Sequence, residues 1–276
     1  MISTNLLQKS LFPILLIFVA AFTGCSDGPD ILGSPAVAAR SGAGDFSTIQ
    51  GAIDASPPGS TIQVMQGRFQ EQIVVAKNLF LVGSGPATII EMGGAKVAFP
   101  DELSDNSSAV MVIRGSESCG TTVENMTFSG PEDGISVRNT CNITIMAVDA
   151  FGNGDDGIDI RDSDTVTVSG MFNGNGDKGV QVRDGSTGVI IQGSQINDNA
   201  GDGARIRESA GSAILDSTVS GNGDDGIGVR DSSGIEIMGN TITNNTEFGI
   251  RIVNSPDTDM ANNTMSGNGD GDVRED

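Results

Sequence analysis

The 276-residue chain contains no histidine, no tryptophan and no tyrosine. Without imidazole, acid–base catalysis by histidine and histidine-ligated metal sites are excluded. Phenylalanine, with 11 copies, is the only aromatic residue left for stacking against sugar rings. Flat carbohydrate binding by aromatic platforms is therefore disfavoured.

Positive charge is also scarce, because 15 Lys and Arg residues stand against 36 Asp and Glu residues, for a formal net charge of −21. Nucleic-acid binding needs a basic stripe that neutralises phosphates, so the composition predicts no nucleic-acid partner. The acidic excess is alternatively an adaptation to salty surroundings, where net charge keeps a protein soluble.

From residue 134 onward the chain repeats a short phrase every 22 to 24 residues. The phrase is Gly, apolar, any residue, apolar, and usually Arg, and it starts at Gly134, Gly157, Gly179, Gly203, Gly226 and Gly249. A second marker keeps the same period at Phe128, Phe151, Phe172, Ile196, Val219, Ile242 and Met265. A fixed period of this length indicates a solenoid, and alternation within the phrase indicates strands with two inward apolar positions. No helix-length apolar pattern lies between repeats, which predicts an all-β parallel β-helix.

Gly/Asn/Asp turns separate the strands, as in the Gly-Asn-Gly-Asp runs that start at residues 152, 174, 221 and 267. One asparagine follows the second marker at a constant distance in successive repeats, at Asn175, Asn199, Asn222, Asn245 and Asn268. Stacked at the strand spacing of about 4.8 Å, these amides should form an Asn ladder. Leucine-rich repeats have a similar period, but their Leu-x-x-Leu-x-Leu motif is absent here. Calcium-binding nonapeptide repeats are excluded because their period of nine residues is not found.

The first 24 residues predict an export signal. A single Lys9 precedes an apolar run from Leu11 to Phe22, too short for a membrane span. Small residues before Cys25 resemble a bacterial lipobox, although Phe22 departs from the usual Leu; an ordinary signal peptide is the alternative. The resemblance implies lipidation of Cys25 and, with Ser26 as the second mature residue, an outer-membrane lipoprotein. Residues 25–44 read as a flexible tether and 45–276 as the β-helix domain.

Residues 45–129 predict the entry to the solenoid. Apolar residues from Phe46 to Ala55 have helical spacing, with Ser47 as the expected cap, and a helix here would shield the first coil. Strands are expected near 61–65, 72–75, 79–82 and 88–92. The stretch DFSTIQGAIDASPPGSTIQVMQGRFQEQIVV, followed by LFLVGSG, resembles the N-terminal cap and first coils of the pectate-lyase-like superfamily. That resemblance implies a single-stranded, right-handed parallel β-helix over residues 45–276, in a superfamily of varied activities.

Most enzymatic branches of that superfamily lack their motifs here. The Asp155-Asp156-Gly157-Ile158 element resembles the aspartate pair of polygalacturonases, but their histidine is missing and the element recurs at Asp224–Ile227 as a repeated turn. The aspartate contexts of pectin methylesterases and the Asp-Pro-His of alginate epimerases are absent as well. Calcium-dependent β-elimination is the branch that remains.

For that branch the resemblance implies an outward Arg or Lys as base beside carboxylates that hold Ca²⁺. The candidate catalytic residues are Arg161, Lys178 and Arg183, the candidate Ca²⁺ ligands are Asp155, Asp156 and Asp159, and the candidate substrate-binding residues are Arg138, Arg207 and Arg230. Lys178 is expected one coil above Asp156, and Arg183 one coil above Arg161. The same residues suit a purely structural role, because carboxylates would neutralise a stacked Arg column.

Cys119 and Cys141 are 22 residues apart, close to one repeat, so they could meet in adjacent coils and form a disulfide within the required Cα separation of roughly 4.4–6.8 Å. Their offsets from Phe128 and Phe151 are nine and ten residues, so the alignment is imperfect. Two stacked free thiols are the alternative.

Two functions follow as hypotheses. The favoured one is an exported, lipid-anchored β-helix that binds polysaccharide or another envelope component without a complete catalytic set, facing the periplasm or the outside. The alternative is a Ca²⁺-dependent lyase of uronate glycans. No cofactor other than this possible Ca²⁺ is expected, and the membrane is met only through the lipid anchor.

Overall fold

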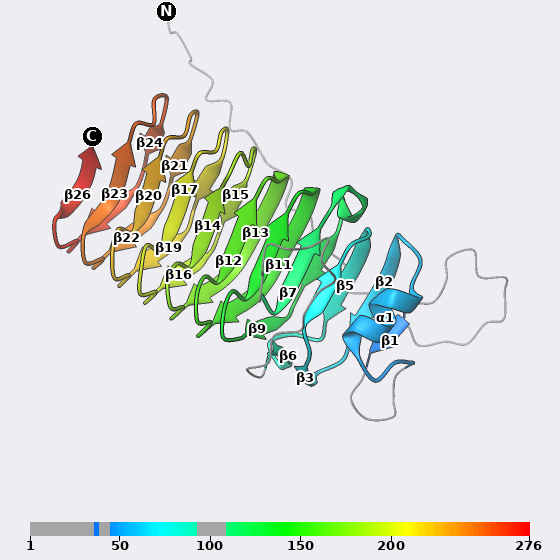
Figure 1. Cartoon of the computed structure of the whole chain (residues 1–276). Coiled ribbons are helices and arrows are strands. Elements are labelled where there is room, and N and C mark those ends of the chain that lie inside the picture. Colours follow the sequence, from blue (N-terminus) through cyan, green and yellow to red (C-terminus); the bar gives the residue numbers. More distant parts are fainter. Residues whose placement is uncertain (1–35, 39–44, 93–108) are drawn as a thin grey trace, which may run out of the picture. The chain divides into compact units, whose positions relative to one another are not determined.

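Short parallel strands stack coil upon coil into a right-handed β-helix, which confirms the expected fold (Figure 1). The computed structural model describes residues 36–38, 45–92 and 109–276, which belong to one compact unit, Pro35–Asp276. Among these described residues, no helix is long and apolar enough to cross a membrane.

One sheet has nine strands, and each coil contributes one strand to it. Its members are β4 (Ile73–Val75), β7 (Met111–Arg114), β10 (Ile135–Arg138), β12 (Ile158–Arg161), β14 (Val180–Arg183), β17 (Ala204–Arg207), β20 (Ile227–Arg230), β23 (Phe248–Val253) and β26 (Gly271–Glu275). The repeated Gly-apolar-x-apolar-Arg phrase forms the strands from β10 to β20. This sheet therefore carries the residues that the sequence singled out.

The remaining strands form the other two sides of each coil and count as one 17-stranded sheet, because β11 and β13 run continuously from one side to the next. One side comprises β1 (Ala36–Ala38), β2 (Ser60–Val64), β5 (Leu79–Gly83), β8 (Thr122–Glu124), β11 (Cys141–Phe151), β13 (Asp164–Asn173), β15 (Ile190–Gln192), β18 (Ala213–Leu215), β21 (Glu236–Met238) and β24 (Asp259–Ala261). The other adds β3 (Gly67–Gln70), β6 (Thr88–Glu91), β9 (Thr127–Ser129), β16 (Gln195–Asn197), β19 (Thr218–Ser220), β22 (Thr241–Thr243) and β25 (Thr264–Ser266). A short 3₁₀ helix, η2 (Ser116–Ser118), follows β7.

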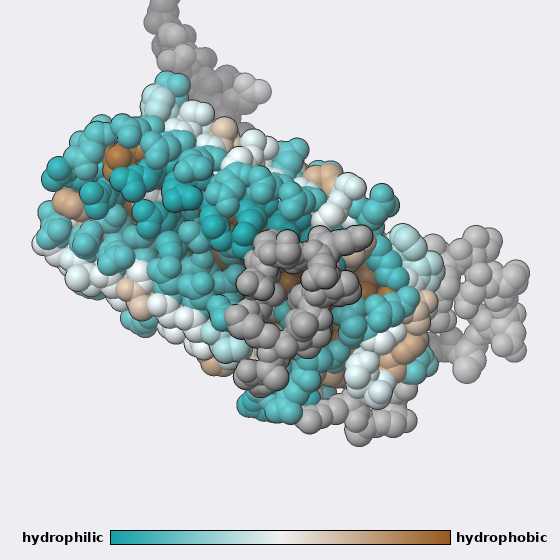
Figure 2. All heavy atoms as spheres, in the orientation of Figure 1, coloured by the Kyte–Doolittle hydropathy of each residue, from teal (hydrophilic) through white to brown (hydrophobic). Residues whose placement is uncertain are grey.

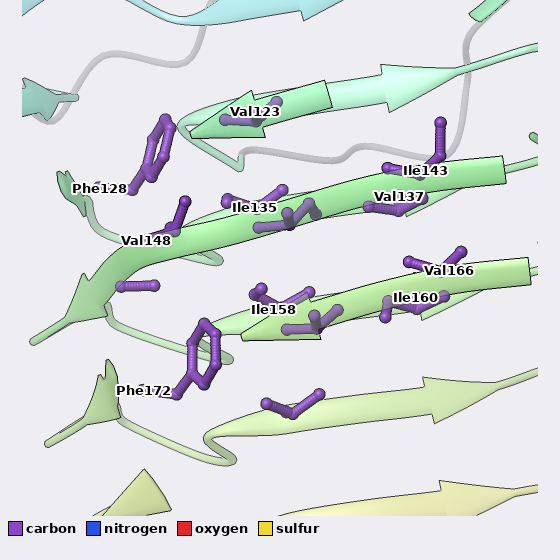
Figure 3. Close-up of a cluster of buried hydrophobic side chains, with 14 of the residues drawn as sticks. Val123, Phe128, Ile135, Val137, Ile143, Val148, Ile158, Ile160, Val166 and Phe172 are labelled. Carbon is purple, nitrogen blue, oxygen red and sulfur yellow. The ribbon is translucent and has the colours of Figure 1, made fainter. Parts of the chain in front are cut away.

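The core is a stack of aliphatic side chains with few aromatic ones, enclosed by the three sides of the coils (Figure 3). Ile158, Val180 and Ile227 are all 0% exposed, as their inward positions in the phrase predict. Burial of each such side chain contributes about 1.5–3 kcal/mol relative to exposure. Parallel pairing in register repeats the same contact in every coil, which explains why the sequence repeats.

An Asn ladder runs along one corner of the coils, and it confirms the expected stack. Asn175 Nδ2 donates to Asn199 Oδ1 at 2.9 Å, and Asn199 Nδ2 donates to Asn222 Oδ1 at 2.9 Å. The ladder starts one coil earlier than expected, because Asn153 Nδ2 donates to Asn175 Oδ1 at 2.9 Å. These amides are buried, so each side-chain bond satisfies a polar group that water does not reach.

The helix α1 (Ile49–Ala55) covers the first coil, as expected, but its N-cap is Thr48 and not Ser47. Its Gln50 side chain binds the backbone of Val74 in the edge strand β4, as a neighbouring strand would: Val74 N donates to Oε1 at 2.7 Å, and Nε2 donates to Val74 O at 3.3 Å. Glu71 accepts from the backbone N–H groups of Ile49 and Gln50 at 2.9 Å each. The helix thus protects a sheet edge that would otherwise offer unpaired groups.

One residue of the second marker does not occupy the same place in its coil as the others. Phe151 is 50% exposed, and Ala150 takes the core position opposite Phe172. The reason is a register shift within β11 between Ile145 and Val148, which moves the following residues by one position. Ala150 is nine residues after Cys141, as Phe128 is after Cys119, so the imperfect alignment of the cysteines disappears.

The structure joins Cys119 and Cys141 by a disulfide, with their Cα atoms 4.6 Å apart. Strand β3 was not expected from the sequence, whereas the strands expected near 61–65, 72–75, 79–82 and 88–92 correspond to β2, β4, β5 and β6. β1 pairs with β2 in parallel register and lies within residues 25–44, where a flexible tether was expected. The signal peptide and Cys25 lie outside the described residues.

Candidate functional site

The outward face of the nine-stranded sheet carries a column of arginines. Parallel register places Arg138 opposite Arg161, Arg161 opposite Arg183, and Arg207 opposite Arg230. The column begins one coil earlier than the sequence indicated, since Arg114 of β7 is the partner of Arg138. Adjacent strands lie about 4.8 Å apart, so the guanidinium groups repeat at the coil spacing.

Exposure of this column rises toward the C-terminal coils. Arg138 is only 3% exposed. The side chains of Arg161 and Arg183 are 21% and 27% exposed, whereas those of Arg207 and Arg230 are 40% and 50% exposed. Figure 2 shows a largely hydrophilic surface over the C-terminal coils. Of the three expected substrate-binding residues, Arg207 and Arg230 therefore offer their charge to solvent and Arg138 does not.

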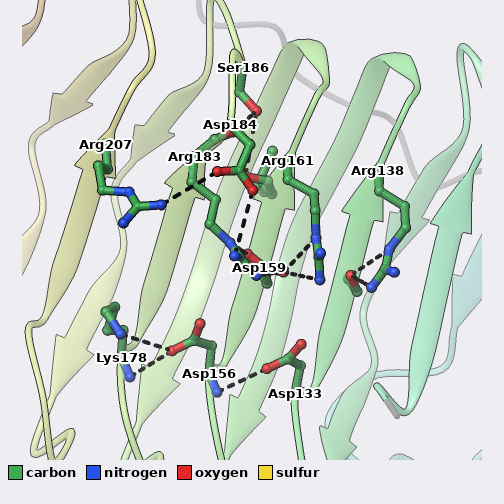
Figure 4. A network of polar contacts seen from close by, with 12 residues as sticks. Asp133, Arg138, Asp156, Asp159, Arg161, Lys178, Arg183, Asp184, Ser186 and Arg207 are labelled. Carbon is green, nitrogen blue, oxygen red and sulfur yellow. Dashed lines mark hydrogen bonds and ion pairs between the residues drawn. The ribbon is translucent and has the colours of Figure 1, made fainter. Parts of the chain in front are cut away.

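Asp159 joins two of the arginines (Figure 4). Its carboxylate side chain is 1% exposed and accepts from Arg183 Nε at 2.9 Å and from Arg183 Nη2 at 3.0 Å. Arg161 donates to the same carboxylate, through Nε at 3.2 Å, and its Nη2 lies 3.1 Å from Oδ2. The hydrogen bonds that Arg183 donates to Asp159 raise the pKa of Arg183 above its ordinary value. Arg183 is thus held firmly in its charged form.

A second column, of mostly acidic residues, precedes the same strands: Asp133, Asp156, Lys178, Asp202 and Asp225. All four carboxylates of this column accept a hydrogen bond from the backbone of the next coil. Asp156 N donates to Asp133 Oδ1 at 3.1 Å, and Lys178 N donates to Asp156 Oδ1 at 2.9 Å. Lys178 Nζ forms an ion pair with Asp177 and lies 3.9 Å from Asp156 Oδ1. Lys178 does lie one coil above Asp156, as expected.

Burial sets the acidity of this column. Desolvation is the largest cause that raises the pKa of Asp156 to about 8, and its repulsion with Asp133 adds to the effect. Desolvation also raises the pKa of Asp133 to about 7, with repulsion from Asp159 next. Two carboxyl groups in this column are therefore partly protonated at neutral pH.

The carboxylates that could share a cation differ from the expected set. Oxygens of Asp133, Asp155 and Asp156 lie within 4.8 Å of one another, whereas Asp159 is engaged by two arginines. The six candidate catalytic and Ca²⁺-binding residues thus separate into an Asp159–Arg161–Arg183 group and an Asp155–Asp156–Lys178 group. Asp133 was missed as a member, although its place directly before a repeat glycine was the available signal.

The site combines fixed guanidinium groups with a buried carboxyl column, an arrangement that can hold an anionic ligand. A profile of the family described as "Periplasmic copper-binding protein (NosD)" matches residues 101–271. No curated protein was found to match the chain.

Solved structures with the same fold include three that are named for polysaccharides. The mannuronan C-5 epimerase AlgE6 A-module of Azotobacter vinelandii is 17% identical, with a TM-score of 0.63 over 80% of this chain and 72% of that one. Pectate lyase Pel9A is 14% identical, with a TM-score of 0.58 over 83% and 73%. The periplasmic alginate epimerase AlgG is 15% identical, with a TM-score of 0.53 over 79% and 83%. At these identities the likeness shows a shared fold.

Proposed function

The chain belongs to the NosD family of periplasmic proteins, and from that premise we propose that it is a cell-envelope β-helix protein that binds polysaccharide along the arginine column without cleaving it. The observation that carries the proposal is the column itself. Its guanidinium groups repeat in register from coil to coil, and their exposure rises from Arg161 to Arg230. A linear array of cations suits a linear polymer with repeating polar or acidic groups.

Binding is favoured over cleavage by the state of the candidate bases. β-Elimination needs a group that accepts a proton from the sugar ring. Arg161 and Arg183 both bind Asp159, and the pKa of Arg183 is raised. Lys178 is paired with Asp177 and is mostly buried. The hydrogen bonds to Asp159 hold Arg183 in its charged form, which cannot act as the base. The side chains of Arg161 and Lys178 are engaged by carboxylates of this chain. The lyase hypothesis remains the second candidate, with Asp133, Asp155 and Asp156 as the carboxylates that could hold Ca²⁺.

Copper, which the family description names, does not fit the described residues. Copper sites use imidazole, thiolate or clustered thioether ligands. The chain has no histidine, and Cys119 and Cys141 are joined in a disulfide. Among the described strands, no register pairing places one methionine opposite another; Met260, for example, pairs with Ile237, and Met265 pairs with Ile242. The family's named ligand therefore supplies no step of the function proposed for this chain.

The test is binding of the exported protein to pectate, alginate, a glycosaminoglycan and a neutral glucan, measured by isothermal titration calorimetry. We expect saturable binding to at least one of the acidic polymers. Arg183→Gln combined with Arg207→Gln should weaken it about tenfold or more. The matched control is Arg68→Gln, because Arg68 is 60% exposed on β3 and pairs with Glu91 on another side of the coil. Binding that survives the double variant unchanged would overturn the assignment, and release of unsaturated uronates would establish the lyase instead.

We further propose that the protein is tethered to the outer membrane through a lipid on Cys25. The support is the lipobox-like sequence, together with a family that is periplasmic by description. Labelled palmitate should be incorporated into the wild type and lost in Cys25→Ala. Incorporation that persists in the variant contradicts the anchor.

A further inference from the structure

A depression of about 220 Å³ opens on the nine-stranded sheet at its C-terminal coils. We call it the Gly228 pocket, and its lining residues are Asp202, Arg205, Asp225, Gly228, Val229, Arg230, Arg251 and Val253. Of these, only Arg230 belongs to the residues that the repeat phrase singled out for binding. The pocket is thus a separate place on the proposed binding face.

The pocket exists because one side chain is missing from a column. The middle outward position of the phrase runs through Gln181, Arg205, Gly228 and Arg251 on successive coils. Gly228 leaves a gap between Arg205 and Arg251, which stand two strand spacings apart, or about 10 Å. Arg230, two residues further along β20, points to the same outward side. Three guanidinium groups therefore border a floor of bare backbone.

These three guanidinium groups have unused hydrogen-bonding capacity. Within the part of the chain that the structure describes, none of them makes a side-chain hydrogen bond. Their ion pairs are long. Arg205 Nη1 lies 3.4 Å from Asp202, and Arg230 Nε lies 4.0 Å from Asp231. Arg251 has two such partners, because its Nη1 lies 3.7 Å from Glu247 and its Nε lies 3.8 Å from Asp276. By contrast, Arg183 binds Asp159 at 2.9 Å. Each guanidinium carries five donors in a fork that matches a carboxylate.

The lining itself carries more positive than negative charge. Its three Arg and two Asp give a formal charge of +1, while Asp231, Glu247 and Asp276 lie at the rim, within 4.0 Å of these guanidinium groups. Both carboxylates are partly used by the backbone, since Asp202 Oδ1 accepts from Asp225 N and Asp225 Oδ1 accepts from Phe248 N, each at 3.1 Å. An incoming anion can therefore take over guanidinium donors that the rim carboxylates hold only through long ion pairs.

We propose that the Gly228 pocket binds the carboxylate of one uronate residue of an acidic glycan. The inference rests on the proposed polysaccharide binding and deepens it by naming the class of sugar and the place where its charge is recognised. The sugar ring would lie along the arginine column while its carboxylate enters between Arg205 and Arg251. A sulfate ester could satisfy the same donors, so the experiment compares the two anions.

The experiment is calorimetry of the full exported chain with a short oligogalacturonate, its carboxyl-reduced neutral counterpart and a sulfated oligosaccharide. Gly228→Gln fills the pocket with the residue type that the same column carries at position 181. A Cβ there would come 3.2 Å from Asp202 Oδ2, a flexible side-chain atom. Arg251→Gln is the second variant, and it removes one guanidinium without filling the space. Arg68→Gln, remote from the pocket, is the control.

We expect the wild type and the control to bind the oligogalacturonate, the neutral counterpart to bind at least about tenfold more weakly, and both pocket variants to lose about tenfold or more in affinity. Equal binding by wild type, Gly228→Gln and Arg251→Gln overturns the pocket while leaving polysaccharide binding intact. Tighter binding of the sulfated sugar overturns the choice of carboxylate.

A second experiment tests the pocket independently of polysaccharide binding. Free galacturonate is titrated into isotope-labelled protein, and the chemical shifts of the backbone amides are followed by NMR. Shifts at Gly228 and Val229 without any polymer binding would keep the pocket and overturn the polysaccharide proposal. No shift at these amides and no binding of the oligomer would overturn both.

Discussion

Replacing Asp156 by asparagine should stabilise the folded protein at neutral and alkaline pH, and the gain should grow as the pH rises. Asp156 is 3% exposed, and burial raises its pKa from an ordinary value of 3.8 to about 8. A carboxyl group whose pKa is raised by folding stabilises the folded state fully below the unfolded pKa. That contribution is lost as the pH rises through the folded pKa. The contribution of Asp156 to the unfolding free energy is therefore lost between about pH 4 and about pH 8.

The magnitude follows from the width of that pH interval. Between pH 5 and pH 8 a lone Asp156 would cost about 3 × 1.36, or about 4 kcal/mol, of unfolding free energy. Asp133 and Asp156 raise each other's pKa, so part of this penalty is shared between them. We expect the wild type to lose roughly 2–4 kcal/mol between pH 5 and pH 9. In the Asp156→Asn variant, the amide oxygen would still accept the hydrogen bond that Lys178 N donates to the native carboxylate at 2.9 Å.

The assay is urea unfolding at pH 5, 7 and 9, followed by far-UV circular dichroism because the chain has no Trp or Tyr for fluorescence. The chain has no histidine, but Asp133 and Asp202 also titrate in this range, because burial raises their pKa values to about 7 and about 6. Asp257→Asn, at an exposed position, is the control and should keep the wild-type pH dependence. Wild-type stability that stays level or rises from pH 5 to pH 9 would refute the reasoning, as would an Asp156→Asn variant with an unaltered pH profile.

Three other outcomes follow from the fold and the site. Asn199→Ala removes side-chain hydrogen bonds to Asn175, Asn222 and Phe172 O in the buried Asn ladder. Urea unfolding should show that the unfolding free energy falls by about 3–5 kcal/mol, and a fall below about 1 kcal/mol would contradict the stabilising role of the ladder. Gln50→Ala removes two hydrogen bonds to the β4 edge and should cost about 1–2 kcal/mol in the same assay. An unchanged unfolding free energy would contradict the protective role of α1. Calorimetric titration with Cu⁺ or Cu²⁺ should reveal no tight stoichiometric site, and a saturable one would contradict the ligand inventory.

Much of the fold could be predicted from the sequence because a solenoid repeats one local rule. The phrase alternates with period two, so Ile158 and Val180 had to face inward together once a parallel stack was assumed. The Asn ladder followed from constant spacing for the same reason. Phe151 escaped prediction because one extra residue in β11 shifts the register, and such a shift leaves no mark in residue type.

The candidate site was less predictable because it depends on side-chain partners and exposure. The repeat spacing predicted that Arg183 lies one coil above Arg161. It did not predict that Asp159 binds both arginines, which leaves its carboxylate unable to serve as a cation ligand. Arg205 and Arg251 stand in the variable position of the phrase, so no motif marked them. Predicting that Arg205 and Arg251 flank Gly228 requires the strand register of three successive coils.

If the arginine face recognises acidic polysaccharide, binding must depend on the negative charge of the polymer. The most direct measurement is calorimetric binding of the exported wild-type chain to an acidic polymer and to its carboxyl-reduced form, at low and high salt. We expect saturable binding of the acidic polymer that weakens with salt, and much weaker binding of the neutral form. Equal affinity for both forms, or no binding to any acidic polymer tested, would contradict it.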